Sequence, residues 1–209
     1  MDFQPVKASD KEIIDKYMKK ANSRSCDMSF AAVYLWKDFY LLEYTVCEDM
    51  LIFRTTEDGS SYSFPIGDAS PEKALLALEA HCKENEEPLK LHCVYRENEA
   101  WLEEHMPGKF EIEFDRDSAD YIYECEKLIG LKGKKFHGKK NHVNKFIKTY
   151  DWAYEKITDD NINDCLAMLY KWKEINCEPG NIEKHAEACV SENALRERKF
   201  LGLKGGLIR

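Results

Sequence analysis

The 209-residue chain has no apolar run approaching the roughly 18–20 residues that are needed to span a bilayer. Its opening residues, Met1 to Pro5, contain neither a basic nor an apolar stretch, so the sequence predicts no signal peptide and no transmembrane segment. The eight cysteines form no CxxC pair, and most of them lie in apolar periodic segments. This pattern is typical of buried, reduced thiols in a cytoplasmic protein.

The familiar catalytic signatures are missing as well. The sequence contains no GxSxG, no Walker A loop and no HExxH. The glycines of residues 202–206 enter a strand pattern rather than a helix, which is the wrong context for cradling a phosphate. His81-Cys82 and His92-Cys93 carry metal-ligating side chains, but adjacent residues point in different directions, so we expect no metal site.

Acidic residues are absent from one long stretch of an otherwise acidic chain. Residues 127–150, here called the lysine segment, contain eight lysines and no aspartate or glutamate. The whole chain has 31 basic and 39 acidic residues; without these eight lysines the counts are 23 and 39, a net charge of −16. A basic block in an acidic body is suited to a phosphate, a carboxylate or a nucleic-acid backbone. A solvated helix face is the alternative interpretation.

The residues before the lysine segment predict an α+β sandwich, in which helices cover both faces of one mixed sheet. Its 44% hydrophobic content is enough for a sizeable core. The pattern predicts helices at about 10–18, 28–37, 71–82 and 97–106, and strands at 39–47, 51–56, 61–66, 89–95 and 110–114.

Local signals place the ends of these elements. Ser9 with Glu12 resembles a capping box, Asp27 is a candidate N-cap, and Ser70-Pro71 is a typical helix start. The short turn at Glu48-Asp49 and that at residues 57–60 favour antiparallel hairpins.

A second unit is predicted after the lysine segment. A short helix from about Asp117 or Ser118 to Leu128 leads into it. In the lysine segment, Phe136, Val143, Phe146 or Ile147, and Tyr150 form a thin apolar line, which predicts a helix lying on another surface by one edge. The second unit then reads as a strand at 152–157, a helix capped by Thr158, a loop at 179–181, a helix at 182–198 and a strand from Phe200.

The end of the chain resembles the first strand of a hairpin without its partner. About 58 residues rarely form an independent α+β core, so, if 209 residues are the full length, the second unit is expected to lean on the first. We also expect the natural protein to extend beyond Arg209. The predicted divisions are 1–133, 134–150 and 151–209.

The candidate binding residues lie at the start of the lysine segment. Lys135, Lys139 and His142 share one helix face at i, i+4 and i+7, and Asn141 adds a two-way hydrogen-bonding amide. Such a face suits a polyphosphate or the phosphates of a tRNA acceptor stem. The residues selected for this site are Lys134, Lys135, Lys139, Lys140, Asn141 and His142, with His137 beside them.

Other polar and aromatic groups have ordinary structural explanations. Asp115, Asp117 and Asp120 stand at a strand end and a helix start, where capping is favoured over general acid–base work. The aromatic cluster is interpreted as core rather than as a ligand platform; its members are Tyr34, Trp36, Phe39, Tyr40 and Tyr44. No partner can be named for His81, His92, His105 or His185.

Several stretches together resemble one known family. They are Phe114–Tyr123, Leu128-Ile129 and Gly133–Phe146, with Phe64-Pro65-Ile66-Gly67 and Phe3-Gln4-Pro5-Val6 upstream. The chain resembles, over nearly its whole length, the phosphatidylglycerol lysyltransferase C-terminal domain family. The long DYIY…GKKFHGKKNHVNKF pattern makes the resemblance specific.

The resemblance implies a tandem pair of GNAT-like acyltransferase folds joined by a helix, with the second unit starting at Trp152 and incomplete here. Members with known activity transfer an aminoacyl group from aminoacyl-tRNA to a lipid headgroup. The sequence is expected to stop before the second unit's central strands, where a GNAT fold places its acyl-donor cleft, and to lack the membrane portion of those lysyltransferases, so no catalytic residue is carried over. Lys140-Asn141-His142 matches a basic-Asn-His pattern of the family and is carried over for binding.

The expected function is therefore an acyl- or aminoacyltransferase whose acceptor is unknown, with acyl-CoA and aminoacyl-tRNA as the two candidate donors. A non-catalytic module that binds tRNA or another polyanion is the alternative. No DNA partner is expected, and the oligomeric state stays open.

Overall fold

The computed structural model describes residues 1–57, 59–119 and 121–209, so Asp58 of one predicted turn and Asp120 of the predicted carboxylate group lie outside it. The first half contains β1 (Gln4–Pro5), α1 (Lys11–Ala21), α2 (Phe30–Trp36), β2 (Glu43–Cys47), β3 (Met50–Thr55), β4 (Ser61–Ser63), α3 (Pro71–Glu84), β5 (Leu91–His92) and α4 (Arg96–His105). The rest contains α5 (Cys125–Gly130), the 3-10 turn η2 (Lys134–Phe136), α6 (His137–Thr149), β6 (Tyr154–Lys156), α7 (Ile162–Asn176), α8 (Ile182–Arg196), α9 (Arg198–Leu201) and β7 (Gly206–Ile208).

The five strands of the first half form one mixed sheet in the order β1-β2-β3-β4-β5. Successive pairs are antiparallel from β1 to β4, and β4 pairs with β5 in parallel. The predicted α+β fold is therefore confirmed. The β2–β3 hairpin turns at Glu48 and Asp49, with φ values of 51° and 57°. Positive φ at both positions is the type I′ geometry that matches the twist of the strands.

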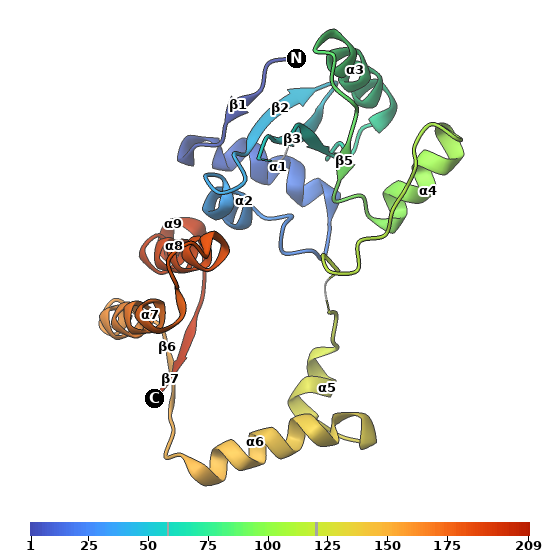
Figure 1. The fold of residues 1–209 in the computed structure, drawn as a ribbon. Helices are drawn as coiled ribbons and strands as arrows, with labels where there is room; N and C mark the ends of the chain where they lie inside the picture. The colour runs from blue at the N-terminus through green and yellow to red at the C-terminus, as the bar shows by residue number, and fades with distance from the viewer. Residues whose placement is uncertain (58, 120) are drawn as a thin grey trace.

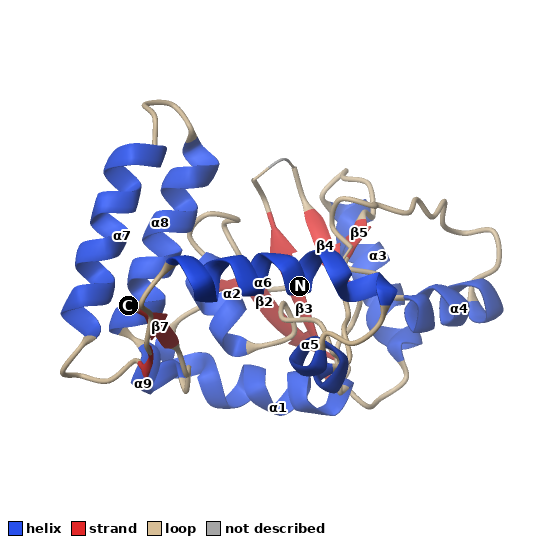
Figure 2. Cartoon of the chain, turned by 90° about the horizontal axis from the view of Figure 1, so that it is seen from below, coloured by secondary structure: helices blue, strands red, loops and turns tan. Residues whose placement is uncertain are grey.

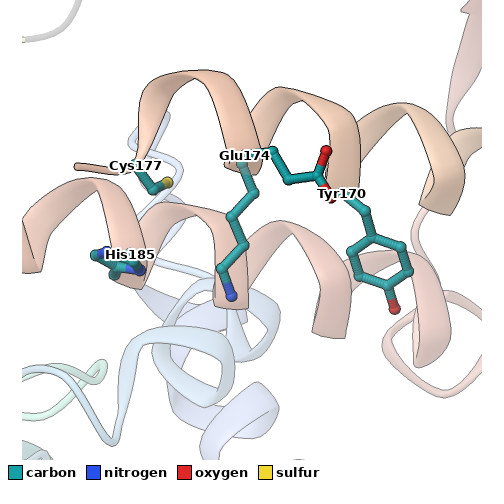
Figure 3. Close-up of a pocket in the computed structure, with 5 residues that line it drawn as sticks. Tyr170, Glu174, Cys177 and His185 are labelled. Carbon is teal, nitrogen blue, oxygen red and sulfur yellow. The ribbon is translucent and has the colours of Figure 1, made fainter. Parts of the chain in front are cut away.

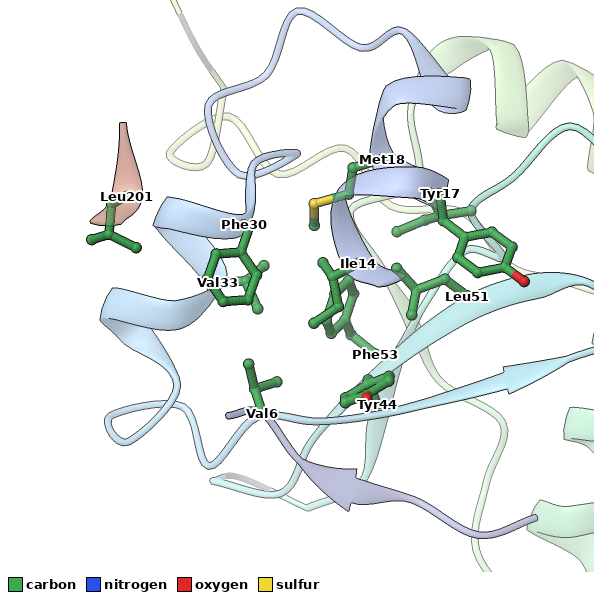
Figure 4. Packing of buried hydrophobic residues seen from close by; sticks show 11 residues of the cluster. Val6, Ile14, Tyr17, Met18, Phe30, Val33, Tyr44, Leu51, Phe53 and Leu201 are labelled. Carbon is green, nitrogen blue, oxygen red and sulfur yellow. The ribbon is translucent and has the colours of Figure 1, made fainter. Parts of the chain in front are cut away.

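Alternation along β3 builds a core on each face of the sheet. Leu51 and Phe53 pack against α1 and α2, as Figure 4 shows, while Met50 and Ile52 pack against α3. All four side chains are at least 95% buried. A strand whose two faces are both covered is apolar throughout, which explains the unbroken Met-Leu-Ile-Phe run.

The helix starts differ in part from those predicted. The Ser70-Pro71 start of α3 is confirmed. Leu76 of that helix does not join its buried face, because its side chain is 47% exposed. The Ser9–Glu12 capping box is wrong, because the Lys7 N–H donates to the Asp10 carboxylate at 2.8 Å instead. The N-caps of α2 and α7 also lie two or three residues after the predicted ones, at Ser29 and Asn161.

In α2, the Ser29 hydroxyl, rather than Asp27, accepts the Ala32 N–H at 3.2 Å. Before α7, Asn161 accepts the Thr158 N–H at 2.8 Å, so Thr158 is not the cap. The predicted helix before Leu128 begins only at Cys125.

The predicted strand at 110–114 is wrong. Ile112 and Phe114 are 42% and 74% exposed, and the segment is irregular. Strict alternation stabilises a strand only when a neighbouring strand pairs with it and one face is covered. The strand expected at 89–95 is likewise reduced to Leu91 and His92.

The C-terminal helices lean on the first unit, as predicted. Figure 2 shows α7 and α8 side by side, and α8 continues into α9 near α2. The Phe200 ring meets Phe30 and Tyr34 edge-on, with centroids 6.2 and 5.8 Å away, and Leu201 is 7% exposed inside the first core. Phe200 and Leu201 are helical, so the strand predicted from Phe200 is wrong; Gly202 ends α9 in the left-handed conformation, at φ 70°.

The last strand has a partner, contrary to prediction. β7 pairs with β6 in antiparallel register, with Ile208 opposite Tyr154. A Cβ on Gly206 would collide with the Tyr154 ring, and one on Gly205 would crowd Ile157. These glycines therefore serve close strand pairing, and Arg209 adds a 2.7 Å ion pair to Glu155.

Candidate polyanion-binding site

Helix α6 carries most of the predicted binding residues. Gly133, at φ 91°, turns the chain into η2, and the helix runs from His137 until Tyr150 becomes extended. The predicted helical lysine segment is thus present from Lys134 to Thr149. Figure 1 shows α5 and α6 leaving the sheet and returning to β6, so that α6 forms the far side of a wide loop.

Every residue of α6 is exposed, and none is buried. The prediction that one edge of this helix lies on another surface is wrong. Val143, Phe146 and Ile147 remain 45%, 37% and 49% exposed. The apolar line predicted from their spacing exists on the helix, but the described residues leave it uncovered.

The structure brings the six predicted residues together on one continuous element. Lys134 and Lys135 lie in η2, and Lys139, Lys140, Asn141 and His142 lie in the first turns of α6. Within the described parts of the chain, the only ion pair made by the lysine segment is that of Lys127 with Glu124, at 2.7 Å. The other lysines of the segment therefore have no carboxylate partner among the described residues and are open to an external anion.

Aromatic side chains border this basic surface. The Lys139 ammonium lies 5.3 Å from the centre of the Tyr123 ring. Further along, the Phe146 ring lies 5.1 Å from that of Tyr150 and 6.2 Å from that of Trp152. The sequence pattern identified the lysines, Phe146 and Tyr150, but not Tyr123 and Trp152, which lie outside the helix.

The predicted carboxylates stabilise a turn. The Asp115 carboxylate accepts the Ser118 hydroxyl and the Asp117 N–H, the latter at 2.9 Å. The hydrogen bond from the Ser118 hydroxyl is the largest cause that lowers the pKa of the Asp115 carboxyl, and the bond from the Asp117 N–H lowers it further. The predicted helix-capping role is wrong, because the helix begins only at Cys125; the Asp115 carboxylate, held in its charged form, instead stabilises a turn, which does not suit a proton donor.

His92, His105 and His185 lie outside the lysine segment. His105 stacks on Trp101 at 4.4 Å, and His185 lies 3.3 Å from the Glu178 carbonyl oxygen. His92 pairs with a residue that the sequence did not connect to it: its Nδ1 lies 2.5 Å from the Ser61 hydroxyl. Burial, and then Lys90, lowers the pKa of His92 to about 4, so the imidazole is neutral at pH 7.

The aromatic cluster is core only in part. Tyr44 is 3% exposed, and Tyr34 packs against the first core and stacks on Phe30. Trp36, Phe39 and Tyr40 pack on one another with ring centroids 4.9–5.7 Å apart, but Tyr40 is 42% exposed. The core interpretation is therefore confirmed for Tyr44 and wrong for Tyr40.

Two surface hollows lie on the C-terminal helices, away from α6. One, of about 480 Å³, lies between α7 and α8 and is lined by Tyr170, Lys173, Glu174, Cys177 and His185 (Figure 3). The other, of about 370 Å³, lies where Trp36 of α2 meets α7 and α8, with Trp172 and Glu187 among its lining. Both were missed from sequence, since their residues come together only through helix packing.

The parts of the chain that the structure describes contain neither a membrane-spanning helix nor a metal-binding cluster. Among residues 1–57, 59–119 and 121–209, no helix combines the length and apolar character that crossing a membrane requires. The same residues contain no group of three histidine, cysteine, aspartate or glutamate side chains arranged to hold a metal ion.

The fold and the exposed helix define an α+β protein with a basic helical arm. Residues 18–209 match the family described as phosphatidylglycerol lysyltransferase, C-terminal. The chain therefore belongs to this family, as its sequence motifs predicted.

Two individual proteins are similar. A crystal structure of a conserved protein of unknown function from Bacteroides thetaiotaomicron superposes with a TM-score of 0.89 at 31% identity, covering 100% of this chain and 71% of that one. An uncharacterised protein of Mycoplasmoides gallisepticum is 33% identical over 63 residues, which are 29% of this chain and 20% of that protein. This second match thus spans about a fifth of the relative's length.

Proposed function

We propose that the chain acts as an acyl- or aminoacyltransferase of the lysyltransferase C-terminal type, and that α6 holds the anionic part of the donor. The observation that carries the proposal is the lysine segment, whose charges from Lys132 to Lys148 are exposed and, among the described residues, unpaired. Family membership supplies the reaction class. Aminoacyl-tRNA and acyl-CoA are the candidate donors, because both join a reactive acyl group to phosphates.

The reaction is a substitution at a carbonyl carbon. An acceptor amine or hydroxyl attacks the ester or thioester carbon, the new bond forms, and the tRNA oxygen or the CoA sulfur leaves with the proton that the acceptor loses. Charge develops on the carbonyl oxygen, so the site must position the donor and stabilise that oxygen. The lysine segment is proposed for donor positioning alone, and we assign no catalytic residue.

We also propose that the first lobe, residues 1–133, is GNAT-like, that 134–150 connects, and that 151–209 begins a second GNAT-like unit. Support comes from the mixed sheet with helices on both faces and from the restart of strand and helix patterning at β6. An aminoacyl-tRNA donor requires a cytoplasmic location, where such donors are made.

The alternative is a module that retains the fold and binds a polyanion without catalysis. It is supported by the two hollows on the C-terminal helices, because neither is lined by a lysine of the segment. The two functions share a binding step and differ in turnover.

The test gives the full chain two donors separately, aminoacyl-tRNA and acetyl-CoA, each labelled in the acyl group. Loss of acyl group from the bound donor faster than its spontaneous hydrolysis, with transfer to an added amine or lipid, supports the transferase. Retention without turnover supports the binding module. Absence of binding to both donors overturns both proposals.

A further inference from the structure

We infer that α6 and its aromatic border bind a single-stranded end of RNA, with lysines on the phosphates and aromatic rings on the bases. This inference rests on the proposed function and names the part of the donor that the site recognises. Aminoacyl-tRNA carries its amino acid on a single-stranded 3′ end. The aromatic border is defined here as Tyr123, Phe146, Tyr150 and Trp152.

The first observation is that the rings are open to solvent. Phe146, Tyr150 and Trp152 are 37%, 59% and 41% exposed, and Tyr123 is 44% exposed. Their neighbours in the segment are lysines rather than an apolar core. Aromatic faces that border a basic surface are the arrangement by which proteins bind single strands, because every base offers a face for stacking.

The second observation is that charge and rings lie along one edge. Lys139, Val143 and Phe146 are spaced by four and three residues, which places them on the same side of the helix, and the Tyr150 ring lies 5.1 Å from that of Phe146. Lys139 already lies over the Tyr123 ring, at 5.3 Å. The 13 residues of α6 span about 20 Å, long enough for several successive stacked bases.

A duplex cannot use this edge fully. Its bases are stacked on one another, so only its phosphates can contact the lysines. A single strand can present both its phosphates and its base faces, and each stacked base strengthens binding by about five-fold to a hundred-fold. The site is therefore expected to bind single strands more tightly than duplexes with equal numbers of phosphates.

Charge decides between RNA and a protein as the occupant of this edge. An apolar protein segment would bury Phe146 and Trp152 but would leave the neighbouring lysines without counter-charges. A second copy of this chain that paired through the same segment would bring another set of eight lysines, and the two sets would repel each other.

The experiment measures binding of the full chain to a labelled short oligoribonucleotide, single-stranded or annealed to its complement. The variant Phe146→Leu/Trp152→Leu keeps the surface apolar and removes two rings. It should bind the single strand at least ten-fold more weakly and the duplex within about two-fold of the parent. Trp172→Leu, which alters a 36% exposed tryptophan on α7, is the matched control and should bind like the parent.

The outcomes separate this inference from the proposed function. If the leucine variant binds both RNAs like the parent while reversal of Lys135, Lys139 and Lys140 abolishes binding, the stacking inference is overturned and polyanion binding stands. If the parent binds neither RNA, the inference is overturned, and acyl-CoA is the one candidate donor left for the proposed function. Sedimentation of parent and leucine variant completes the test, because a change of oligomeric state without a change in RNA affinity assigns the aromatic border to a second copy and overturns the inference.

Discussion

Reversing the charge of three lysines at the start of the lysine segment tests the proposal that this segment binds an anion. The substitutions Lys135→Glu, Lys139→Glu and Lys140→Glu change the charge of the lysine segment from +8 to +2. Each lysine that neutralises a phosphate contributes about 0.7–0.9 to the slope of log affinity against log salt. Loss of three such contacts lowers that slope by about 2 to 3, and binding of tRNA at low salt should weaken ten-fold or more.

The assay is a salt titration of tRNA binding, at concentrations where the screening length is above and below about 10 Å. The variant should fold normally, because α6 buries no side chain and exposed substitutions change the free energy of unfolding by about 0.5 kcal/mol or less. Its thermal unfolding curve checks this.

A matched control reverses Lys19, Lys73 and Lys83, which are exposed on α1 and α3 and produce the same change in net charge. This control should bind tRNA within about three-fold of the parent, because salt largely screens the interaction between exposed charges that lie further apart than about 10 Å. Equal weakening by the control and the α6 variant would refute the reasoning, because net charge rather than the arm would then govern binding. An unchanged α6 variant would refute it as well.

Three further predictions concern stability. Leu51→Ala should lower the free energy of unfolding in urea by about 2–5 kcal/mol, because Leu51 is 0% exposed between the sheet and the helices. Ile13→Ala, at a residue that is 40% exposed, should change it by less than about 1 kcal/mol, and equal effects of the two variants would contradict the packing described. Phe200→Ala with Leu201→Ala should speed proteolysis within α7–α9 more than within the sheet, and unchanged cleavage would show that these contacts do not hold the helices. The pKa of His92 is about 4 in the folded chain and about 6.5 in the unfolded chain, so between these pH values the unfolded chain binds more protons. The free energy of unfolding of the parent should therefore fall as the pH falls from 6.5 to 4. That of His92→Gln should fall less, and urea unfolding at each pH measures the difference.

Local sequence patterns predicted many of the helices and turns. The elements that they failed to predict depend on contacts between residues far apart in the sequence. The Glu48-Asp49 turn and the Ser70-Pro71 helix start were readable because each depends on a few adjacent residues. The predicted strand at 110–114 failed because alternation cannot say whether a neighbouring strand is present. Ser61 and His92 are 31 positions apart, and only the β4–β5 pairing brings them together.

The candidate site shows the same division. The sequence located the lysines and predicted their helix, since both properties are local. It also predicted a covering surface for the apolar line at Val143 and Phe146, which the described residues do not supply. Spacing along a helix shows which side chains share an edge, but what covers that edge depends on tertiary packing. Binding by these residues stays a prediction that the salt titration tests.

The burial of Leu201 in the first core has a consequence for how the protein is made. That core joins Val6, Phe30 and Ile66 to a residue about 135 positions further along the chain. Ribosomes add about 5–20 residues per second, so roughly 7–27 s separate the synthesis of Ile66 from that of Leu201. During this interval the α2 face that Phe200 and Leu201 later cover is open to water. The nascent chain therefore presents a defined apolar surface to chaperones until its last helices emerge.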